Sequence, residues 1–194
     1  MNGAALSEND GCCWVFGYGS LMWRPEFSHL AQVPGVLRGF HRSFCVWSRH
    51  WRGTPERPGL VLGLAPGGQC EGVAFKVAAA DWPGVKAYLD ERELMSYAYA
   101  ACWLPVELTG GEAGAVSAYT FISDPEHPHY AGELPVERAA DVIVAARGVA
   151  GLNRDYLIET LRRMATEGFV DETLRALLRR VEYLTGILES GSGI

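Results

Sequence analysis

The sequence predicts an α+β fold, in which a small mixed or antiparallel β-barrel is surrounded by helices that are concentrated in the C-terminal part of the chain. Stretches rich in Val, Phe, Trp and Tyr, which favour strands, dominate the chain before position 124. Short turns separate most of these stretches, whereas an alternating βαβ fold would place a helix between successive strands. After position 134 the apolar residues change to the spacing of amphipathic helices.

The strand-rich part predicts about six strands, of which the first runs into a turn that contains two glycines. The segment Ala65-Pro66-Gly67-Gly68-Gln69 separates two of the apolar stretches, and we expect those two strands to pair as a hairpin around it. The expected strands are 14–16, 36–48, 60–64, 70–77, 97–108 and 115–123.

One short helix is expected within the strand-rich part, with Asp81 as its N-cap and Pro83 in its first turn. Three helices are expected at 135–147, 153–167 and 171–188, and Gly148 and Gly168 are expected to close the first two. The last of them places leucines and a valine at helical spacing on one face, namely Leu174, Leu177, Leu178, Val181 and Leu184.

The composition predicts one domain and excludes several classes of partner. A chain of 194 residues with 48% hydrophobic residues can bury a full core, and we expect a single domain over 12–190 after a loose lead-in at 1–11. A net charge of −6 argues against nucleic acid and anionic membranes as partners. We find no apolar run of about 20 residues and no basic, apolar leader, so we expect a soluble cytoplasmic protein.

The cysteines and histidines do not indicate a metal or a cofactor. Five cysteines, without paired Cys-x-x-Cys spacing, predict reduced thiols instead of a disulfide framework or a zinc site. His127 and His129 flank a proline without a further ligand at helix spacing, and we interpret them as part of a polar loop. We therefore expect neither metal nor cofactor.

The turn that follows the first strand, Gly17-Tyr18-Gly19-Ser20-Leu21-Met22, is the first candidate site. Its glycines allow a ligand to approach the main chain, so several N–H groups could hold a carboxylate there. An ordinary strand-to-loop turn explains the same pattern. The dinucleotide fingerprint is excluded because Met22 stands where a third glycine is needed, and the pattern of a nucleophile elbow is absent around Ser20.

The acidic end of the short helix is the second candidate site. Asp90 and Glu93 would share one helix face, while Glu91 points elsewhere. The alternative interpretation is that these acids, with Arg92 among them, simply form a solvated helix end. Glu93 also stands where the helix meets an aromatic strand, and a carboxyl group in apolar surroundings has a raised pKa and can exchange protons near neutral pH.

Five ordered motifs give the chain a resemblance to a known family. They are WVFGYGSLMWRPEF, WRGTPERPGLVLGL, CEGVAFKV, YLDERELMSY and YAGELPVERAADVIVAARGVAGLNRDYL. Together they resemble the ChaC-type γ-glutamylcyclotransferases from Trp14 to about Met164. The resemblance implies that fold and a lyase-like reaction without cofactor, in which the γ-glutamyl group of glutathione cyclises and 5-oxoproline and cysteinylglycine are released.

The resemblance also implies roles for particular residues. Glu93 would transfer the proton, and the substrate would be bound by Gly17, Tyr18, Gly19, Ser20, Leu21 and Met22. Arg38 and Tyr130 are secondary candidates near the pocket, although they also read as a strand-edge charge and a loop aromatic. The segment 94–97 is bulkier than the glycines typical of the family, which could alter the pocket.

Two other functions stay open at this point. The substrate could be another γ-glutamyl amine or amino acid, since such compounds would use the same turn and the same acid. The chain could also be a non-catalytic binding or regulatory module of the same fold. The partner that we expect is a small molecule, and the sequence does not decide the oligomeric state.

Overall fold

The computed structural model describes residues 11–94, 98–110 and 114–187. Within these ranges the chain forms two compact units, which are described separately below. The first unit contains the segments up to His41 and from Pro66 to Ile122, and the second contains Arg42 to Ala65 and the segments after Ser123. The predicted lead-in lies outside the described residues, except for Gly11.

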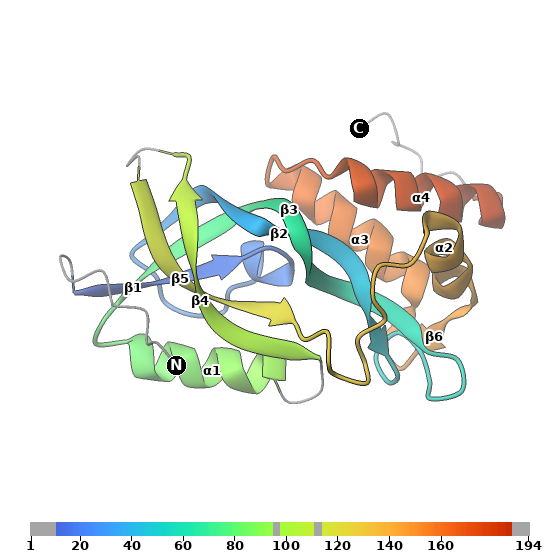
Figure 1. Ribbon diagram of the computed structural model, residues 1–194, viewed down its shortest axis with the longest axis horizontal. Helices are drawn as coiled ribbons and strands as arrows, with labels where there is room; N and C mark the ends of the chain where they lie inside the picture. The colour runs from blue at the N-terminus through green and yellow to red at the C-terminus, as the bar shows by residue number, and fades with distance from the viewer. Residues whose placement is uncertain (1–10, 95–97, 111–113, 188–194) are drawn as a thin grey trace. The chain divides into compact units, whose positions relative to one another are not determined.

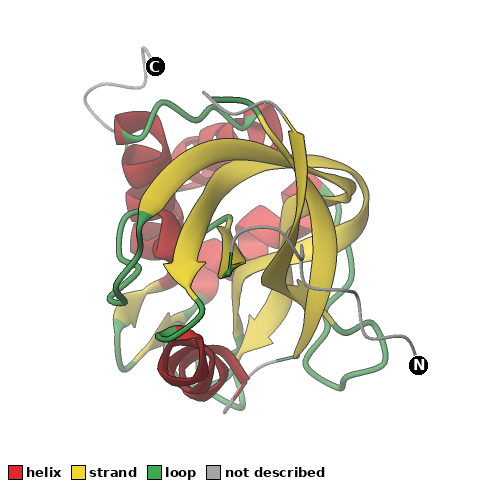
Figure 2. Cartoon of the chain, turned by 90° about the vertical axis from the view of Figure 1, so that its left-hand side faces the viewer, coloured by secondary structure: helices red, strands yellow, loops and turns green. Residues whose placement is uncertain are grey.

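A closed barrel of five strands, in the order β1-β3-β2-β4-β5, confirms the predicted fold class. Strand β1 is antiparallel to β3 and parallel to β5, and β2 is antiparallel to β4, so the barrel is mixed. Figure 2 shows the strands curving around the barrel. The strands are β1 (Cys12–Gly17), β2 (Ala31–Ser48), β3 (Gly59–Ala78), β4 (Tyr99–Leu108) and β5 (Gly114–Ser123).

Strand β3 corrects one prediction, because the two strands expected on either side of a hairpin turn form one continuous strand. Gly67 and Gly68 have φ angles of 98° and 68°, which glycine adopts without steric cost. The chain can therefore bend there without reversing, and β3 continues beside β2. The hairpin prediction was wrong because it treated Pro66 and the glycines as an end of the strand.

Strand β2 begins five residues before the predicted start. Its first residues lie next to two other strands, since Leu30 N–H donates to Lys76 O at 2.7 Å and Thr109 N–H donates to Pro34 O at 2.8 Å. Pro34 lacks an N–H group, but its carbonyl still accepts this bond. Pairing with distant segments thus extends the strand through a residue that disfavours strands.

The first unit also contains helix α1 (Trp82–Leu94), which contacts β4 (Figure 1). Its predicted start is confirmed, because Val85 N–H donates to Asp81 O at 3.0 Å in the first turn. Leu89 on this helix is fully buried. The large fully buried side chains of the barrel part of this unit are Val15, Phe16, Leu37, Phe75 and Phe121.

The second unit contains three helices that pack against one another (Figure 1). They are α2 (Val136–Ala145), α3 (Asn153–Thr166) and α4 (Glu172–Thr185). Helix α2 ends before the predicted boundary, because Arg147–Gly148 forms strand β6 and pairs with β7 (Gly151–Leu152). Fully buried side chains in this unit include Leu60, Leu64, Ile143, Leu157, Met164 and Leu174.

Helix α4 has a cap at each end. The Asp171 carboxylate accepts a hydrogen bond from Leu174 N–H at 3.1 Å, and Gly186 ends the helix with a φ of 66°. Its predicted apolar face is partly confirmed, since Leu174 is buried whereas Leu184 is 36% exposed. None of the helices in the described ranges combines the length and the apolar character needed to cross a membrane.

Candidate active site

The Gly17 turn leads from strand β1 into the 3₁₀ helix η1 (Ser20–Met22). Two main-chain hydrogen bonds close it, from Met22 N–H to Gly19 O and from Arg24 N–H to Ser20 O, both at 2.9 Å. Leu21 and Met22 are buried, whereas the Ser20 side chain is exposed. The buried Leu21 and Met22 therefore anchor the turn, while the Ser20 side chain stays accessible.

Close packing explains the first glycine of this turn. A Cβ atom on Gly17 would lie 3.0 Å from the Leu21 Cβ, which is tighter than ordinary van der Waals contact. Across the barrel pair, a Cβ atom on Gly72 would lie 2.4 Å from Gly17 O. The turn can therefore fold back on β1 because both positions lack a side chain.

Glu93 lies in the last turn of helix α1 with a side chain that is 21% exposed. Burial raises the pKa of its carboxyl group. The Arg92 Nε lies 3.1 Å from Glu93 Oε1, and this cation acts in the opposite direction on the same pKa. The result is a partly buried acid whose pKa is raised despite an adjacent guanidinium group.

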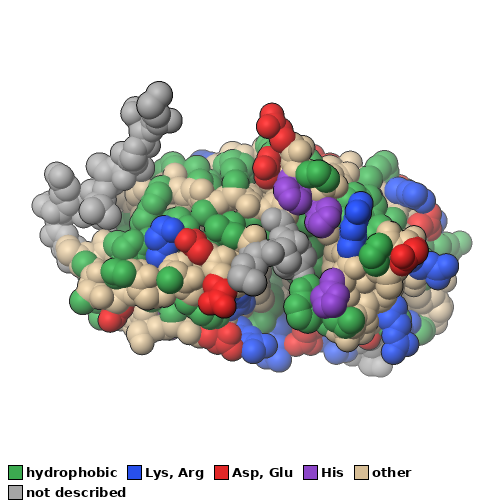
Figure 3. Space-filling model, turned by 90° about the horizontal axis from the view of Figure 1, so that it is seen from below, with side chains coloured by type: hydrophobic (Ala, Val, Ile, Leu, Met, Phe, Trp, Pro, Cys, Tyr) green, Lys and Arg blue, Asp and Glu red, His purple; other side chains and the backbone are tan. Residues whose placement is uncertain are grey.

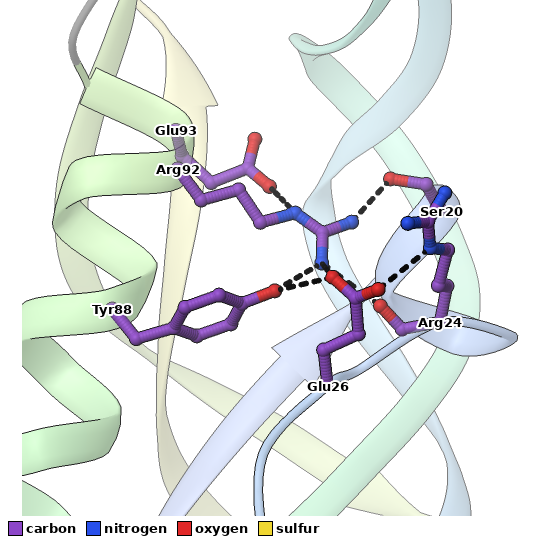
Figure 4. Close-up of polar contacts among 6 residues, drawn as sticks. All are labelled: Ser20, Arg24, Glu26, Tyr88, Arg92 and Glu93. Carbon is purple, nitrogen blue, oxygen red and sulfur yellow. Dashed lines mark hydrogen bonds and ion pairs between the residues drawn. The ribbon is translucent and has the colours of Figure 1, made fainter.

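Arg92 connects the end of helix α1 to the Gly17 turn (Figure 4). Its Nη2 donates to Ser20 Oγ at 2.8 Å, and its Nη1 donates to Arg24 O and to the Tyr88 hydroxyl, each at 2.8 Å. Together with the ion pair between Nε and Glu93, these contacts involve all three nitrogen atoms of the guanidinium group. The candidate acid and the turn are therefore held by one side chain.

A second carboxylate, Glu26, completes this group of polar side chains (Figure 4). It accepts hydrogen bonds from Arg24 Nε at 2.8 Å and from the Tyr88 hydroxyl at 3.0 Å. These two hydrogen bonds lower the pKa of Glu26. Its φ of 57° is unusual for a residue with a side chain, and the polar contacts hold it in that conformation.

The other two acids of helix α1 have different surroundings. Asp90 accepts a hydrogen bond from the Tyr119 hydroxyl through Oδ1 and forms an ion pair with Lys86 through Oδ2. Glu91 is exposed. Of the three acids that the sequence singled out, Glu93 is therefore the one beside the Gly17 turn.

The two secondary candidates have partners outside the candidate site. Arg38 is exposed on β2, where its guanidinium group donates twice to Glu107 at 2.8 Å and once to Gln69 at 3.1 Å. Tyr130 belongs to the second unit, where it forms a backbone bridge with Val46 and has a pKa that burial raises.

Four residues of this site were not singled out from the sequence: Arg24, Glu26, Tyr88 and Arg92. In the sequence, Arg92 is one charged residue among several at a polar helix end, so it gives no sign of a special role. Tyr88 and Arg92 nevertheless stand four residues apart and therefore share a helix face. Glu26 carried no signal at all, because it lies in an irregular loop 62 residues from Tyr88.

The cysteines and histidines form no competing site among the described residues. All five cysteines lie in the described ranges, and none of them forms a disulfide bond. Burial raises the pKa of the Cys45 thiol to about 11, which disfavours the reactive thiolate at neutral pH. No three His, Cys, Asp or Glu side chains of the described chain gather in a way that could hold a metal ion.

Comparison with known proteins identifies a family and several relatives that this chain resembles. The family model described as ChaC-like protein matches residues 13–184. The glutathione-specific γ-glutamylcyclotransferase of Escherichia coli is 35% identical over 93% of this chain and 77% of its own length. The human glutathione-specific γ-glutamylcyclotransferase 1 is 32% identical over 92% of this chain and 83% of its own length.

A solved structure agrees with the fold. The crystal structure of the yeast γ-glutamylcyclotransferase specific to glutathione aligns with a TM-score of 0.78 and 23% sequence identity, covering 89% of this chain and 99% of that one. At this identity the likeness shows a common fold.

Proposed function

Because the chain belongs to the ChaC-like family, we propose that it is a γ-glutamylcyclotransferase that acts on glutathione and releases 5-oxoproline and cysteinylglycine. The relatives from Escherichia coli and human carry that activity in their names and match most of this chain. The observation that carries the proposal is the position of Glu93, a partly buried carboxyl group that Arg92 holds beside the Gly17 turn.

The reaction needs no nucleophile from the protein, because the γ-glutamyl group contains one. Its α-amine attacks the δ-carbonyl carbon, so a new nitrogen–carbon bond closes the five-membered ring. The bond from that carbon to the cysteine nitrogen then breaks. The protein has to fold the substrate until the amine and the carbonyl carbon are about 3 to 3.5 Å apart.

Glu93 is the proposed general base and acid. In its ionised form it accepts a proton from the attacking amine, and it then delivers that proton to the departing nitrogen of cysteinylglycine. The carboxylate is regenerated at the end of the cycle, so the proton balance closes. Its raised pKa favours the first half of this task, because a carboxylate of higher pKa accepts a proton from the amine more readily.

The Gly17 turn is the proposed site for the γ-glutamyl group. Its main chain would hold the substrate α-carboxylate or the oxyanion that develops at the δ-carbonyl, with Gly17, Tyr18, Gly19, Ser20, Leu21 and Met22 around the group. The buried Leu21 and Met22 support this role because they fix the turn from below.

Arg92 is the proposed positioning residue. It contacts Glu93, the Ser20 hydroxyl and the Arg24 carbonyl at once, so it sets the distance between the acid and the turn. Its charge also restrains the pKa of Glu93, which burial alone would raise further.

Release of 5-oxoproline from reduced glutathione tests the proposal. The purified protein, without added metal, is expected to form 5-oxoproline and cysteinylglycine in equal amounts. If glutathione is inert but another γ-glutamyl amine or amino acid is cyclised, the chemistry stands and the substrate is wrong. If no γ-glutamyl compound is cyclised by a folded protein, the proposal fails and a binding or regulatory module becomes the better description.

The cellular setting that we propose is the cytoplasm, where reduced glutathione is abundant and the cysteine thiols of this chain would stay reduced. We also propose that residues 12–190 act as one functional domain, because the family match spans residues 13–184.

A further inference from the structure

A cavity of about 400 Å³ lies in the second unit and shares no residue with the candidate active site. One wall is the loop between β2 and β3, and the other is strand β6 with the first residue of the turn that follows it. Its size is within the usual range for small-molecule sites. The lining residues are Arg49, His50, Gly53, Thr54, Pro55, Arg147, Gly148 and Val149.

The two walls are joined through their main chains. Val149 N–H donates to His50 O at 3.0 Å, and Ala150 N–H donates to Trp51 O at 2.9 Å. A Cβ atom on Gly148 would lie 2.4 Å from each of those carbonyl oxygens, so no other residue fits at this position without movement of the main chain. The main-chain segments on the two sides of the cavity therefore hold each other in place.

The charged side chains that line the cavity are both basic. Its lining contains Arg49 and Arg147 and no acidic residue. In the described ranges neither arginine forms an ion pair or a side-chain hydrogen bond. Burial and the charge of Arg49 both lower the pKa of the neighbouring His129. A chain with a net charge of −6 thus has two arginines and no acidic residue in the lining of this cavity, and Figure 3 shows histidine side chains near both basic and acidic ones on the face that it draws.

A third arginine in the same loop has a structural role that these two lack. Arg52 Nη1 donates to Ala150 O at 2.7 Å and to Leu152 O at 3.3 Å, and its guanidinium group lies 5.3 Å from the centre of the Tyr156 ring. Arg52 therefore fastens the two walls together. The guanidinium groups of Arg49 and Arg147 keep their donors for a ligand.

We propose that this cavity binds a small anion, with Arg49 and Arg147 each directing guanidinium N–H donors to oxygens of a phosphate or carboxylate group. Guanidinium groups match these oxyanions through paired hydrogen bonds. The inference goes beyond the proposed function, since the cyclisation involves neither arginine.

Isothermal titration calorimetry with inorganic phosphate, and separately with succinate, tests this binding. Saturable binding of at least one probe is expected, and it should weaken as ionic strength rises. Arg49→Gln combined with Arg147→Gln should reduce the affinity at least tenfold. Arg57→Gln is the matched control, because Arg57 is exposed in the same loop but does not line the cavity, and it should change the affinity less than twofold.

The preferred probe distinguishes a phosphate-bearing ligand from a dicarboxylate. Absence of saturable binding by both probes overturns the proposal, and so does equal affinity in the double variant. If the double variant does not fold, as judged by circular dichroism, the single variants carry the test, and each should lose affinity while Arg57→Gln does not. Release of 5-oxoproline should be unaffected by probe binding at the cavity, so the failure of either proposal can be recognised independently.

Discussion

Two of the acids on helix α1, Asp90 and Glu93, are three residues apart and have different partners. Both carboxylate oxygens of Asp90 are occupied, one by the Tyr119 hydroxyl and the other by the Lys86 ammonium group. The carboxylate of Glu93, in contrast, pairs with Arg92 alone among the described residues. Because residues three apart share a helix face, the helix itself does not explain this difference.

The surroundings of the two acids explain it. Asp90 borders an aromatic cluster in which the centre of the Tyr119 ring lies 5.4 Å from that of Trp82 and 5.3 Å from that of Trp103. The hydrogen bond from Tyr119 to Asp90 joins helix α1 to this cluster. Glu93 lies where the helix ends beside the Gly17 turn. The comparison shows that the hydrogen bonds and ion pairs of a carboxylate distinguish a structural acid from a candidate for proton transfer better than its position on the helix does.

The largest effect is expected for Glu93→Gln. This change keeps the shape of the side chain but removes its ability to accept a proton, so turnover of glutathione should fall by about 100- to 10,000-fold. Initial rates of 5-oxoproline release measure it. Asp90→Asn is the matched control, and it should retain turnover within a few fold; equal losses in the two variants would break the distinction drawn above.

Arg92→Gln should lower kcat/KM by roughly tenfold and should also change its pH dependence. Arg92 holds down the pKa of Glu93, so without it that pKa rises further. If the ionised carboxylate accepts the amine proton, the acidic limb of the kcat/KM profile then moves to higher pH.

Arg92→Lys is the companion to this experiment, because it keeps the charge but loses the guanidinium fork. It should restore the pH profile more completely than the rate. A purely structural Arg92 would instead give both variants the pH profile of the native protein.

Asp90→Asn is expected to reduce stability instead of turnover. The change leaves the Lys86 ammonium group without its anionic partner and weakens the hydrogen bond from Tyr119, which together cost about 1–3 kcal/mol of the free energy of unfolding. Urea denaturation measures this loss. A variant as stable as the native protein would show that the contacts of Asp90 with Lys86 and Tyr119 contribute nothing to the free energy of unfolding.

Tyr119→Phe should have a smaller effect, about 1 kcal/mol at neutral pH, through the loss of one hydrogen bond. Burial and the Asp90 carboxylate raise the pKa of Tyr119 to about 12. The folded state therefore holds this proton more tightly than the unfolded chain, and that contribution is complete below about pH 10 and is lost as the pH rises toward 12. The difference in stability between the native protein and the variant should shrink over this interval, as measured by denaturation at a series of pH values.

The smallest effect is expected for Ser20→Ala, which removes one of the acceptors of the Arg92 guanidinium group. The Arg24 carbonyl and the Tyr88 hydroxyl remain, so Arg92 should keep its place and kcat should change less than about threefold. Steady-state kinetics with glutathione measure this. A loss as large as that of Arg92→Gln would mean that the Ser20 hydroxyl itself acts on the substrate.

Sequence patterns predicted the local elements well and the paired ones less well. The first strand, the start of helix α1 and the limits of α3 follow from short-range apolar spacing and caps, and they agree with the structure within one or two residues. One error falls where distant segments pair, as in the continuous strand β3, and another where a local pair of short strands, β6 and β7, replaces the expected end of α2. The resemblance to the ChaC-type family is confirmed, while the roles assigned to the individual site residues remain predictions.

By itself, the sequence determined the strand-rich first part, the helical second part and the motifs that place the chain in its family. Only the tertiary structure decided which charges meet. Arg92 and Ser20 are 72 residues apart, and Tyr119 is 29 residues from Asp90. Closure of the barrel and packing of helix α1 bring such residues into contact, and burial then changes the pKa of Glu93. Sequence spacing carries information about neighbours on one element, whereas desolvation and ion pairing depend on what other elements place around a side chain.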